Sequence, residues 1–496
     1  MNRYPGKQFH TAAPEQEGVF SSAIEKLLTR LECKLCDIHS LLIWRHGALL
    51  HEQYYAPYTA ETAHCMYSCS KTFTSMLIGV AQGKGLLSVE DTVLSFFPDV
   101  PVDAPSDNLR AMKIKHLLMM GCGHNECSLD SLANSPDGDW VRTFLNLPVP
   151  NEPGTHFVYN TGGSYMLSAI LTKVTGKTEL ELANEWLFGP LGIEDAHWDA
   201  DPRGISLGGT GLHVRPRDIL KLGVLILSHG RWKDKQLIPA DYIAEAQRVQ
   251  ISNRNPDDPK QSPHWAAGYG YQMWRCGFDA FRADGMGGQY IVMLPKYDMV
   301  IAITSGVYDM GYVLDAIRDC LLPGVTPCAQ IPVPAETESL AALSRRLAAP
   351  EAVAVPEIDF PFGKKLVLPE NESGLAALTV RKDELDLYFT AGPSLLVRGT
   401  GLPEIPFPQP LTLKLGWNAP EVTEGTFPLL HKWMLYSDGI SVVAREEEGK
   451  LFILVNFLGE PFIYSMSLAP AGESVRATIF SNLITPVEAV CLSEDA

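Results

Sequence analysis

MYSCSKTFT, residues 66–74, places a serine and a lysine three positions apart at the start of a long apolar segment. The segment predicts a buried helix from Ser68 to Lys84, with Lys71 one turn after Ser68 on the same face. A helix start favours negative charge near Ser68, and a lysine held against a buried helix loses hydration, which lowers its pKa. The stretch therefore indicates a serine nucleophile with a lysine base beside it. The alternative is that Ser68 only caps the helix and Lys71 is solvated.

The segments around this stretch predict a mixed α/β domain. Residues 19–33 have the apolar spacing of a helix, and residues 38–55 are typical of a β-hairpin that turns at Gly47. Further on, residues 288–295 and 299–306 predict two neighbouring strands. Helical and strand-like segments alternate as far as residue 322, as in a domain that packs helices on a sheet.

The composition changes after residue 322. Residues 323–336 contain four prolines and predict a stiff connector, and a helix-like piece follows at 338–349. Short alternating segments then predict an antiparallel β sandwich or barrel, with a hairpin tip at 446–450. Because 496 residues exceed what one core usually serves, we expect a catalytic domain over 1–322 and a β-domain over 337–496.

Charge and hydropathy restrict the function classes. The formal net charge is −18 without any block of Lys or Arg, which argues against nucleic acid and anionic membranes as partners. The first residues, MNRYPGKQFHTAAPEQEG, lack the apolar core of a secretory signal, and no apolar run is long enough to span a membrane. We therefore expect a cytoplasmic protein that acts on a small ester, amide or short peptide, with a homodimer as an open possibility.

The cysteines do not predict a cofactor site. Ten of them are scattered along a chain without an export signal, which favours reduced thiols. Cys33-x-x-Cys36 has no second pair, and the loop with Cys122, His124 and Cys127 offers no fourth ligand for zinc. We therefore expect no metal and no cofactor.

SCSKTFT (68–74) resembles the nucleophile motif of class C β-lactamases and of the related esterases, amide hydrolases and D-Ala-D-Ala peptidases. The resemblance covers roughly residues 10–322 and continues in further segments: GLLSVED (85–91), Phe97-Pro98, IKHLLMM (114–120), GGTGL (208–212) and Arg217-Asp218. It implies a β-lactamase/transpeptidase-like α/β (α+β) fold, an antiparallel sheet flanked by helices. It also implies that Ser68 is the nucleophile and Lys71 its base.

The second motif of these enzymes is Tyr-x-Asn, and Tyr159 matches its tyrosine. A phenol near an ammonium ionises more readily, so the resemblance implies that Tyr159 passes a proton between Ser68 and the leaving group. Thr161 stands where the motif has Asn, and we expect the neighbouring Asn160 to point elsewhere. The departure argues against a β-lactam as the natural ligand. Tyr159 as an ordinary core aromatic is the alternative.

The third motif is Lys-Thr-Gly or His-x-Gly, and its counterpart is ADGMGGQY (283–290), with Ala283 in the place of the cation. The resemblance implies that the backbone N–H groups of Ser68 and Met286 form an oxyanion hole. The missing cation argues against recognition of a carboxylate, and this form looks more like the esterase and 6-aminohexanoate-dimer-hydrolase branch. The candidates for the substrate pocket are Thr161, Asp284, Gly285, Gly287 and Gln289, with Trp265, Tyr269 and Trp274 as possible walls.

Three functions remain open from the sequence. The leading hypothesis is a serine hydrolase that cleaves an ester or amide through an acyl-enzyme on Ser68. The second is a β-lactamase or D-Ala peptidase. The third is a ligand-binding module on the same scaffold that has lost turnover. An α/β-hydrolase is disfavoured because no Gly-x-Ser-x-Gly elbow occurs.

Overall fold

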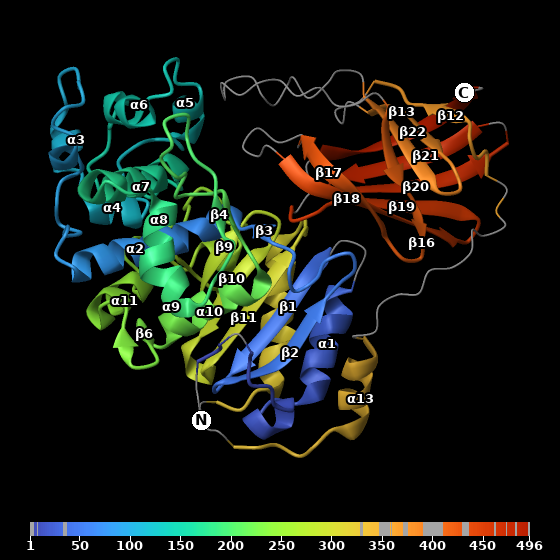
Figure 1. The fold of residues 1–496 in the computed structure, drawn as a ribbon, viewed down its shortest axis with the longest axis horizontal. Helices are drawn as coiled ribbons and strands as arrows, with labels where there is room; N and C mark the ends of the chain where they lie inside the picture. The colour runs from blue at the N-terminus through green and yellow to red at the C-terminus, as the bar shows by residue number, and fades with distance from the viewer. Residues whose placement is uncertain are drawn as a thin grey trace.

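A computed structural model provides the structure of the chain. It describes residues 4–6, 8–32, 37–327, 331–346, 358, 360–370, 375–389, 410–428, 436–460, 463–472, 474–481 and 484–494. Figure 1 shows an N-terminal part with a central sheet between helices, and a C-terminal part made of strands. This arrangement confirms the predicted fold class.

The central sheet has six strands in the order β2-β1-β11-β10-β9-β8, and all of its pairs are antiparallel. Its strands are β1 (Ile38–Arg45), β2 (Ala48–Tyr54), β8 (Trp274–Arg275), β9 (Phe281–Gly285), β10 (Gln289–Leu294) and β11 (Met299–Ser305). His46 and Gly47 join β1 to β2 at positive φ (49° and 95°), as a tight hairpin turn requires. The predicted hairpin and the predicted pair of late strands are therefore confirmed.

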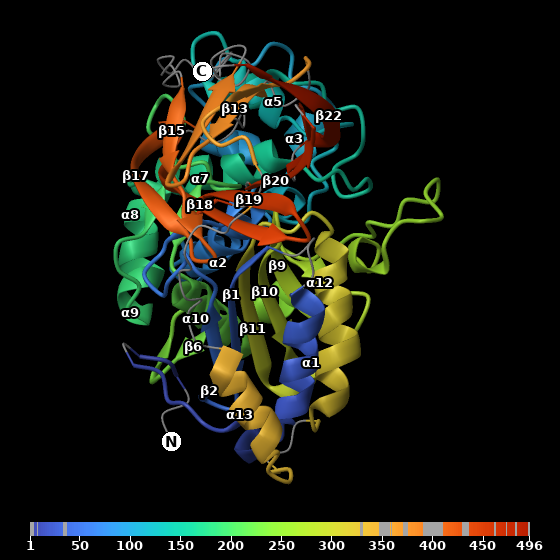
Figure 2. The same cartoon turned by 90° about the vertical axis from the view of Figure 1, so that its right-hand side faces the viewer.

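Helices cover both faces of this sheet (Figure 2). One face packs on α1 (Ser21–Leu31) and α12 (Met310–Ala316), and the other on α10 (Pro216–Leu227). Side chains that alternate along β10 divide between the two cores, because successive residues of a strand point to opposite faces. Both cores are apolar, and the sheet is buried between them.

A helical layer continues the second core beyond the sheet. At its centre is α2 (Ser70–Gly83), which packs on α7 (Thr161–Thr175). The remaining helices of this part are α3 (Asp107–Ala111), α4 (Ile114–Leu118), α5 (Leu129–Ala133), α6 (Trp140–Asn146), α8 (Glu179–Ala183), α9 (Gly189–Leu191) and α11 (Ala240–Gln247). Small sheets join β3 (His64–Cys65), β5 (Leu212–Val214) and β4 (His197–Trp198), and β6 (Arg231–Trp232) with β7 (Lys235–Gln236).

The C-terminal part is one large, mostly antiparallel sheet in the order β15-β14-β13-β12-β22-β21-β20-β19-β18-β16, with β17 also paired to β18. Its strands are β12 (Lys365–Val367), β13 (Leu375–Val380), β14 (Glu384–Phe389), β15 (Leu411–Lys414), β16 (Gly416–Trp417), β17 (Glu421–Pro428), β18 (Tyr436–Glu447), β19 (Lys450–Phe457), β20 (Ile463–Ala471), β21 (Ser474–Ser481) and β22 (Ile484–Glu494). The Lys414 N–H donates to Thr423 Oγ1 at 2.8 Å, so β15 lies beside β17 and the sheet curls back on itself. An apolar core fills the curled sheet.

The two parts meet at the connection between β19 and β20. Cys65 N–H donates to Gly459 O at 2.9 Å, and the Tyr67 hydroxyl donates to Glu460 Oε2 at 2.7 Å. Cys65 and Tyr67 consequently belong to the apolar core of the C-terminal sheet. Cys65 and Tyr67, which precede Ser68, are thus held in place by Gly459 and Glu460 of the C-terminal part.

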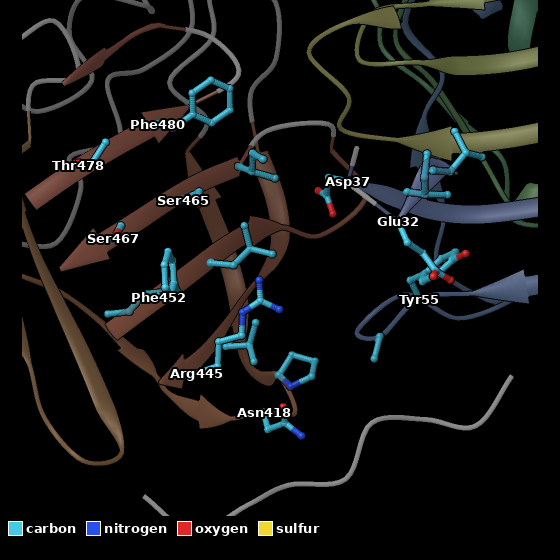
Figure 3. A pocket seen from close by; sticks show the side chains of 18 residues that line it. Glu32, Asp37, Tyr55, Asn418, Arg445, Phe452, Ser465, Ser467, Thr478 and Phe480 are labelled. Atoms are coloured by element: carbon cyan, nitrogen blue, oxygen red, sulfur yellow. The ribbon is translucent and has the colours of Figure 1, made fainter. Parts of the chain in front are cut away.

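A cavity of about 480 Å³ separates the two parts elsewhere (Figure 3). One side is formed by β-strand residues such as Phe452 and Ser465, and the other by Glu32, Asp37 and Tyr55. Ser68 does not line this cavity.

The helix α13 (Thr337–Arg346) lies against α1. Leu343 is buried in the core on the α1 side of the central sheet, and Glu336 accepts from the Ser22 backbone N–H at 2.7 Å. This helix therefore packs with the N-terminal part, and the domain boundaries themselves stay a prediction. None of the helices in the described ranges is long and apolar enough to cross a membrane.

Candidate active site

Ser68 lies in a 3₁₀ turn, Tyr67–Cys69, that leads directly into α2. Every residue from His64 to Ala81 is buried except Ser68, which is partly exposed. No side chain caps the start of the turn or of α2, so Ser68 does not act as an N-cap. Tyr67 has a φ of 46°, a conformation that non-glycine residues rarely adopt. Such backbone strain is concentrated at functional sites.

The Lys71 ammonium reaches Ser68 from the first turn of α2. Its Nζ lies 2.9 Å from Ser68 Oγ and donates to Gly209 O at 2.7 Å. The side chain is only 1% exposed, and this burial lowers the pKa of Lys71 to about 7. The neighbouring side chains of Cys127, Cys69 and Asp284 oppose the shift only in part. Lys71 is thus half deprotonated near neutral pH, as a base needs to be.

The burial of Lys71 also has a consequence for stability. The folded pKa, about 7, lies below the ordinary value of 10.5, so between these pH values the unfolded chain binds a proton that the folded chain does not. We expect the free energy of unfolding of the wild type, relative to Lys71→Met, to rise by about 1.4 kcal/mol per pH unit in this window. Urea unfolding of both proteins at several pH values measures the difference. Curves that stay parallel with pH would contradict the expectation.

Tyr159 lies beside this pair, with its ring centroid 4.9 Å from Lys71 Nζ. It stacks on Trp274 at a centroid distance of 5.2 Å and meets Tyr269 edge to face. Burial raises the pKa of Tyr159 well above its ordinary value, and an interaction with the Ser68 hydroxyl opposes this only in part. The role of Tyr159 in passing a proton stays a prediction, in which the phenol keeps its own proton at neutral pH. Tyr159 stays a neutral phenol.

Thr161 is the first residue of α7 and is 9% exposed. A Cβ on Gly209 would come within 2.7 Å of Thr161 Cγ2, so Thr161 packs on the backbone that receives Lys71. Asn160 caps α7, and its Oδ1 accepts from the Ser128 N–H and hydroxyl at 3.0 and 2.7 Å. Its amide is thus engaged away from Ser68, as predicted.

Strand β9 contains a buried ion pair that the sequence did not indicate. Arg282 Nη2 lies 2.7 Å from Asp284 Oδ2, and the two side chains are 0% and 7% exposed. The guanidinium also lies over the Trp265 ring, 4.8 Å from its centroid, and over the Trp274 ring. Burial raises the pKa of Asp284, and Arg282 opposes the shift. Arg282 therefore connects Asp284 to the aromatic residue on which Tyr159 stacks.

The end of β9 lies against the nucleophile turn. A Cβ on Gly285 would come within 2.3 Å of Met66 O and 3.3 Å of Cys69 N, so only glycine allows this approach. Gly287 has a φ of 73°, which turns the chain from β9 into β10. Gln289 is 1% exposed and its amide bonds backbone groups of Met286 and Ser305. Gln289 therefore braces the turn that carries Met286, and the oxyanion-hole role of Met286 and Ser68 stays a prediction.

Two of the three side chains in the loop with Cys122, His124 and Cys127 are engaged in hydrogen bonds. Cys122 Sγ donates to His116 O, and a ring nitrogen of His124 lies 3.4 Å from the Asn160 side-chain amide. Cys33 and Cys36 lie outside the described residues. Among the residues that the structure describes, no cysteine forms a disulfide.

Sequence reasoning missed the Gly209 carbonyl and the Arg282–Asp284 pair. The glycines of the motif GGTGL (208–212) are the available sequence signal for a close backbone approach to α2. No sequence signal pairs Arg282 with Asp284 beyond their spacing along one strand.

Known proteins are similar to the N-terminal part. The family model described as Beta-lactamase matches residues 39–316. The 6-aminohexanoate-dimer hydrolase of Paenarthrobacter ureafaciens is 22% identical over 316 residues, which are 59% of this chain and 79% of that protein. The β-lactamase of Escherichia coli (strain K12) is 24% identical over 241 residues, 46% of this chain and 60% of that protein. A solved structure from Bacteroides dorei DSM 17855 matches 60% of this chain and 97% of its own, with a TM-score of 0.51 and 18% identity, which supports the fold.

Proposed function

Because the chain belongs to the beta-lactamase family and is a serine hydrolase, we propose that it cleaves an ester or amide through an acyl-enzyme on Ser68. The observation that carries the proposal is the distance of 2.9 Å between the buried Lys71 Nζ and Ser68 Oγ. Ser68 is the one partly exposed residue in the otherwise buried segment from His64 to Ala81. A buried amine with a pKa of about 7 is a suitable base for a serine hydroxyl at neutral pH.

The contacts of Lys71 suggest how the first step proceeds. A neutral amine has two N–H groups and one lone pair, and Gly209 O accepts one N–H at 2.7 Å. This bond orients the amine so that its lone pair can accept the Ser68 proton. The Ser68 Oγ then attacks the carbonyl carbon, and backbone N–H groups of Ser68 and Met286 stabilise the oxyanion.

The second step returns the proton and releases the product. The protonated Lys71 gives its proton to the leaving oxygen or nitrogen, with the neutral Tyr159 phenol beside it as a hydrogen-bond donor and relay. Water then attacks the acyl-enzyme: Lys71 accepts a proton from this water and gives it to Ser68 Oγ as the bond between the acyl carbon and that oxygen breaks. Each bond that forms is balanced by one that breaks: the acyl group passes from the leaving group to Ser68 and then to water.

The charges on β9 favour an uncharged substrate. Asp284 is paired with Arg282, and Ala283 provides no cation where related enzymes place one, so this strand has no net positive charge for a substrate carboxylate. This supports a neutral ester or amide over a penicillin-like acid. The relative from Paenarthrobacter ureafaciens is a 6-aminohexanoate-dimer hydrolase, so by similarity an amide is one candidate for the bond that is cleaved.

A pH profile tests the role of Lys71. We expect kcat/KM for a neutral p-nitrophenyl ester to rise with pH and to be half-maximal near pH 7, because Lys71 must lose its proton to act as a base. Below that pH the rate falls about tenfold per unit. Stopped-flow release of p-nitrophenol measures the rate, and an initial burst would report the acyl-enzyme.

The matched variant is Lys71→Arg, which keeps a cation but offers no base. It is expected to lose about 10²–10⁴-fold in rate together with the ionisation near pH 7. A wild-type profile with its midpoint near the ordinary lysine value would overturn the assignment of Lys71.

A further inference from the structure

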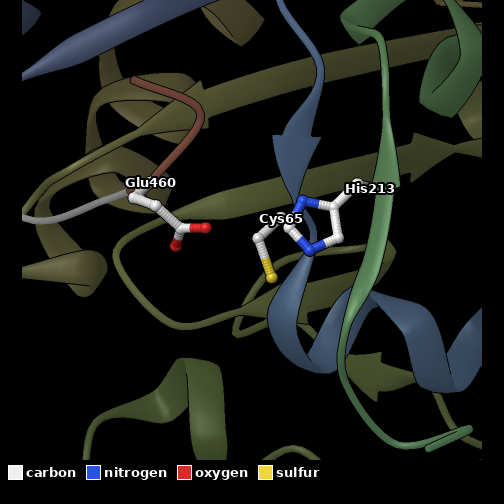
Figure 4. A group of neighbouring side chains, drawn as sticks. All are labelled: Cys65, His213 and Glu460. Atoms are coloured by element: carbon white, nitrogen blue, oxygen red, sulfur yellow. The ribbon is translucent and has the colours of Figure 1, made fainter. Parts of the chain in front are cut away.

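Three side chains with metal-binding atoms meet where the two parts of the chain join. Cys65 Sγ, a ring nitrogen of His213 and a carboxylate oxygen of Glu460 all lie within 4.8 Å of one another (Figure 4). In the described part of the chain this is the one such group of His, Cys, Asp and Glu side chains. It lies outside the proposed catalytic pair.

The backbone brings two of these side chains together. Cys65 on β3 and His213 on β5 are direct cross-strand partners in the antiparallel register, where side chains stand close on one face. The third comes from the connection between β19 and β20, which is fixed by the bond from Cys65 N–H to Gly459 O at 2.9 Å. Segments far apart in the sequence are thus held in place by strand pairing and by a backbone hydrogen bond.

We propose that Cys65, His213 and Glu460 bind a divalent metal ion of the zinc type, with water as the fourth ligand. A thiolate, an imidazole and a carboxylate are ligands that zinc accepts. Tetrahedral zinc with bonds of about 2.0–2.3 Å separates its ligand atoms by roughly 3.3–3.7 Å, so side-chain movements of about 1 Å close the site. Cys65 and Glu460 are 0% and 2% exposed, and His213 is partly exposed, which gives the ion a path from solvent.

Neighbouring groups orient the ligands for this role. Asp199 Oδ2 lies 3.6 Å from His213 Nε2, and a carboxylate behind a histidine leaves the other ring nitrogen for the metal. The Tyr67 hydroxyl donates to Glu460 Oε2 at 2.7 Å, so Oε1 can face the ion. The nearby carboxylates of Asp199 and Glu460 add negative charge around the site, which a divalent cation would offset. The ion would join the C-terminal sheet to the segment that precedes Ser68.

Cobalt binding tests the site without any measurement of turnover. Full-length protein is stripped with a chelator and titrated with Co²⁺, whose bond to a thiolate gives a charge-transfer band in the near ultraviolet. We expect one ion per chain, displacement by Zn²⁺, and loss of the band in Cys65→Ala. His213→Gln and Glu460→Gln keep the thiol and should weaken Co²⁺ binding at least about 100-fold. Loss of a residue that only hydrogen-bonds a metal ligand already lowers metal affinity about 10–100-fold.

Two variants serve as controls. Cys276→Ala removes another buried thiol, and His197→Gln removes a histidine that also bonds Asp199 but is not in the group. Both should bind Co²⁺ as the wild type does. Wild-type protein that shows no thiolate band, or a band that persists in Cys65→Ala and His213→Gln, would overturn the proposal.

Discussion

Replacement of Ser68 by alanine is expected to lower hydrolysis of a p-nitrophenyl ester by at least about 10⁴-fold, to the background rate. Loss of a nucleophile in a serine hydrolase removes nearly all of the rate that the catalytic groups provide together. The fold should be retained, because Ser68 is partly exposed, caps no helix and has Lys71 as its hydrogen-bond partner. Steady-state kinetics and circular dichroism measure the two effects.

The matched control is Ser75→Ala, a buried serine on the same helix whose hydroxyl bonds Tyr242. Intact mass after incubation with a fluorophosphonate should show one adduct on the wild type and on Ser75→Ala, and none on Ser68→Ala. Turnover or an adduct that survives in Ser68→Ala would contradict the acyl-enzyme on this residue. No adduct on any of the proteins would favour the ligand-binding module instead.

The second large effect concerns stability. Arg282→Met is expected to lower the free energy of unfolding by about 3–5 kcal/mol, because it leaves the Asp284 carboxylate buried without its partner. It also removes the guanidinium from the Trp265 ring. Urea unfolding followed by tryptophan fluorescence measures the change.

The double variant Arg282→Met/Asp284→Ala separates the charge effect from simple loss of packing. Removing both partners leaves no unpaired buried charge, so most of the lost stability should return. The difference from the sum of the single effects gives the coupling energy of the pair. Effects that simply add would show that the pair is not coupled.

Much of the N-terminal fold follows from local sequence patterns. The apolar run after Lys71 predicts a buried helix, and α2 is one; the alternating segments around Gly47 predict the β1–β2 hairpin. These predictions succeed because helices and hairpins depend on residues close in the sequence. The approach of Lys71 to Ser68 is of the same kind, since residues three apart share a helix face.

The features that the sequence does not indicate depend on contacts between residues far apart in the chain or on the packing around them. Glu460 bonds Tyr67 across 393 positions, and no local pattern relates two such residues. The raised pKa of Tyr159 depends on how completely the aromatic residues bury it, which packing decides. Arg282 and Asp284 share a strand, yet their burial follows from the tryptophans that surround them.

The contact between Tyr67 and Glu460 has a consequence for synthesis of the protein. Tyr67 holds a backbone conformation that is unfavourable for its residue type, and one of its supports is made 393 positions later. At about 5–20 residues per second, translation separates these two residues by roughly 20–80 s. During that interval the segment before Ser68 lacks two acceptors, the Gly459 carbonyl for the Cys65 N–H and the Glu460 carboxylate for the Tyr67 hydroxyl. A nascent chain therefore carries its serine and lysine early, whereas the segment before Ser68 gains these two supports only after Glu460 has emerged from the ribosome.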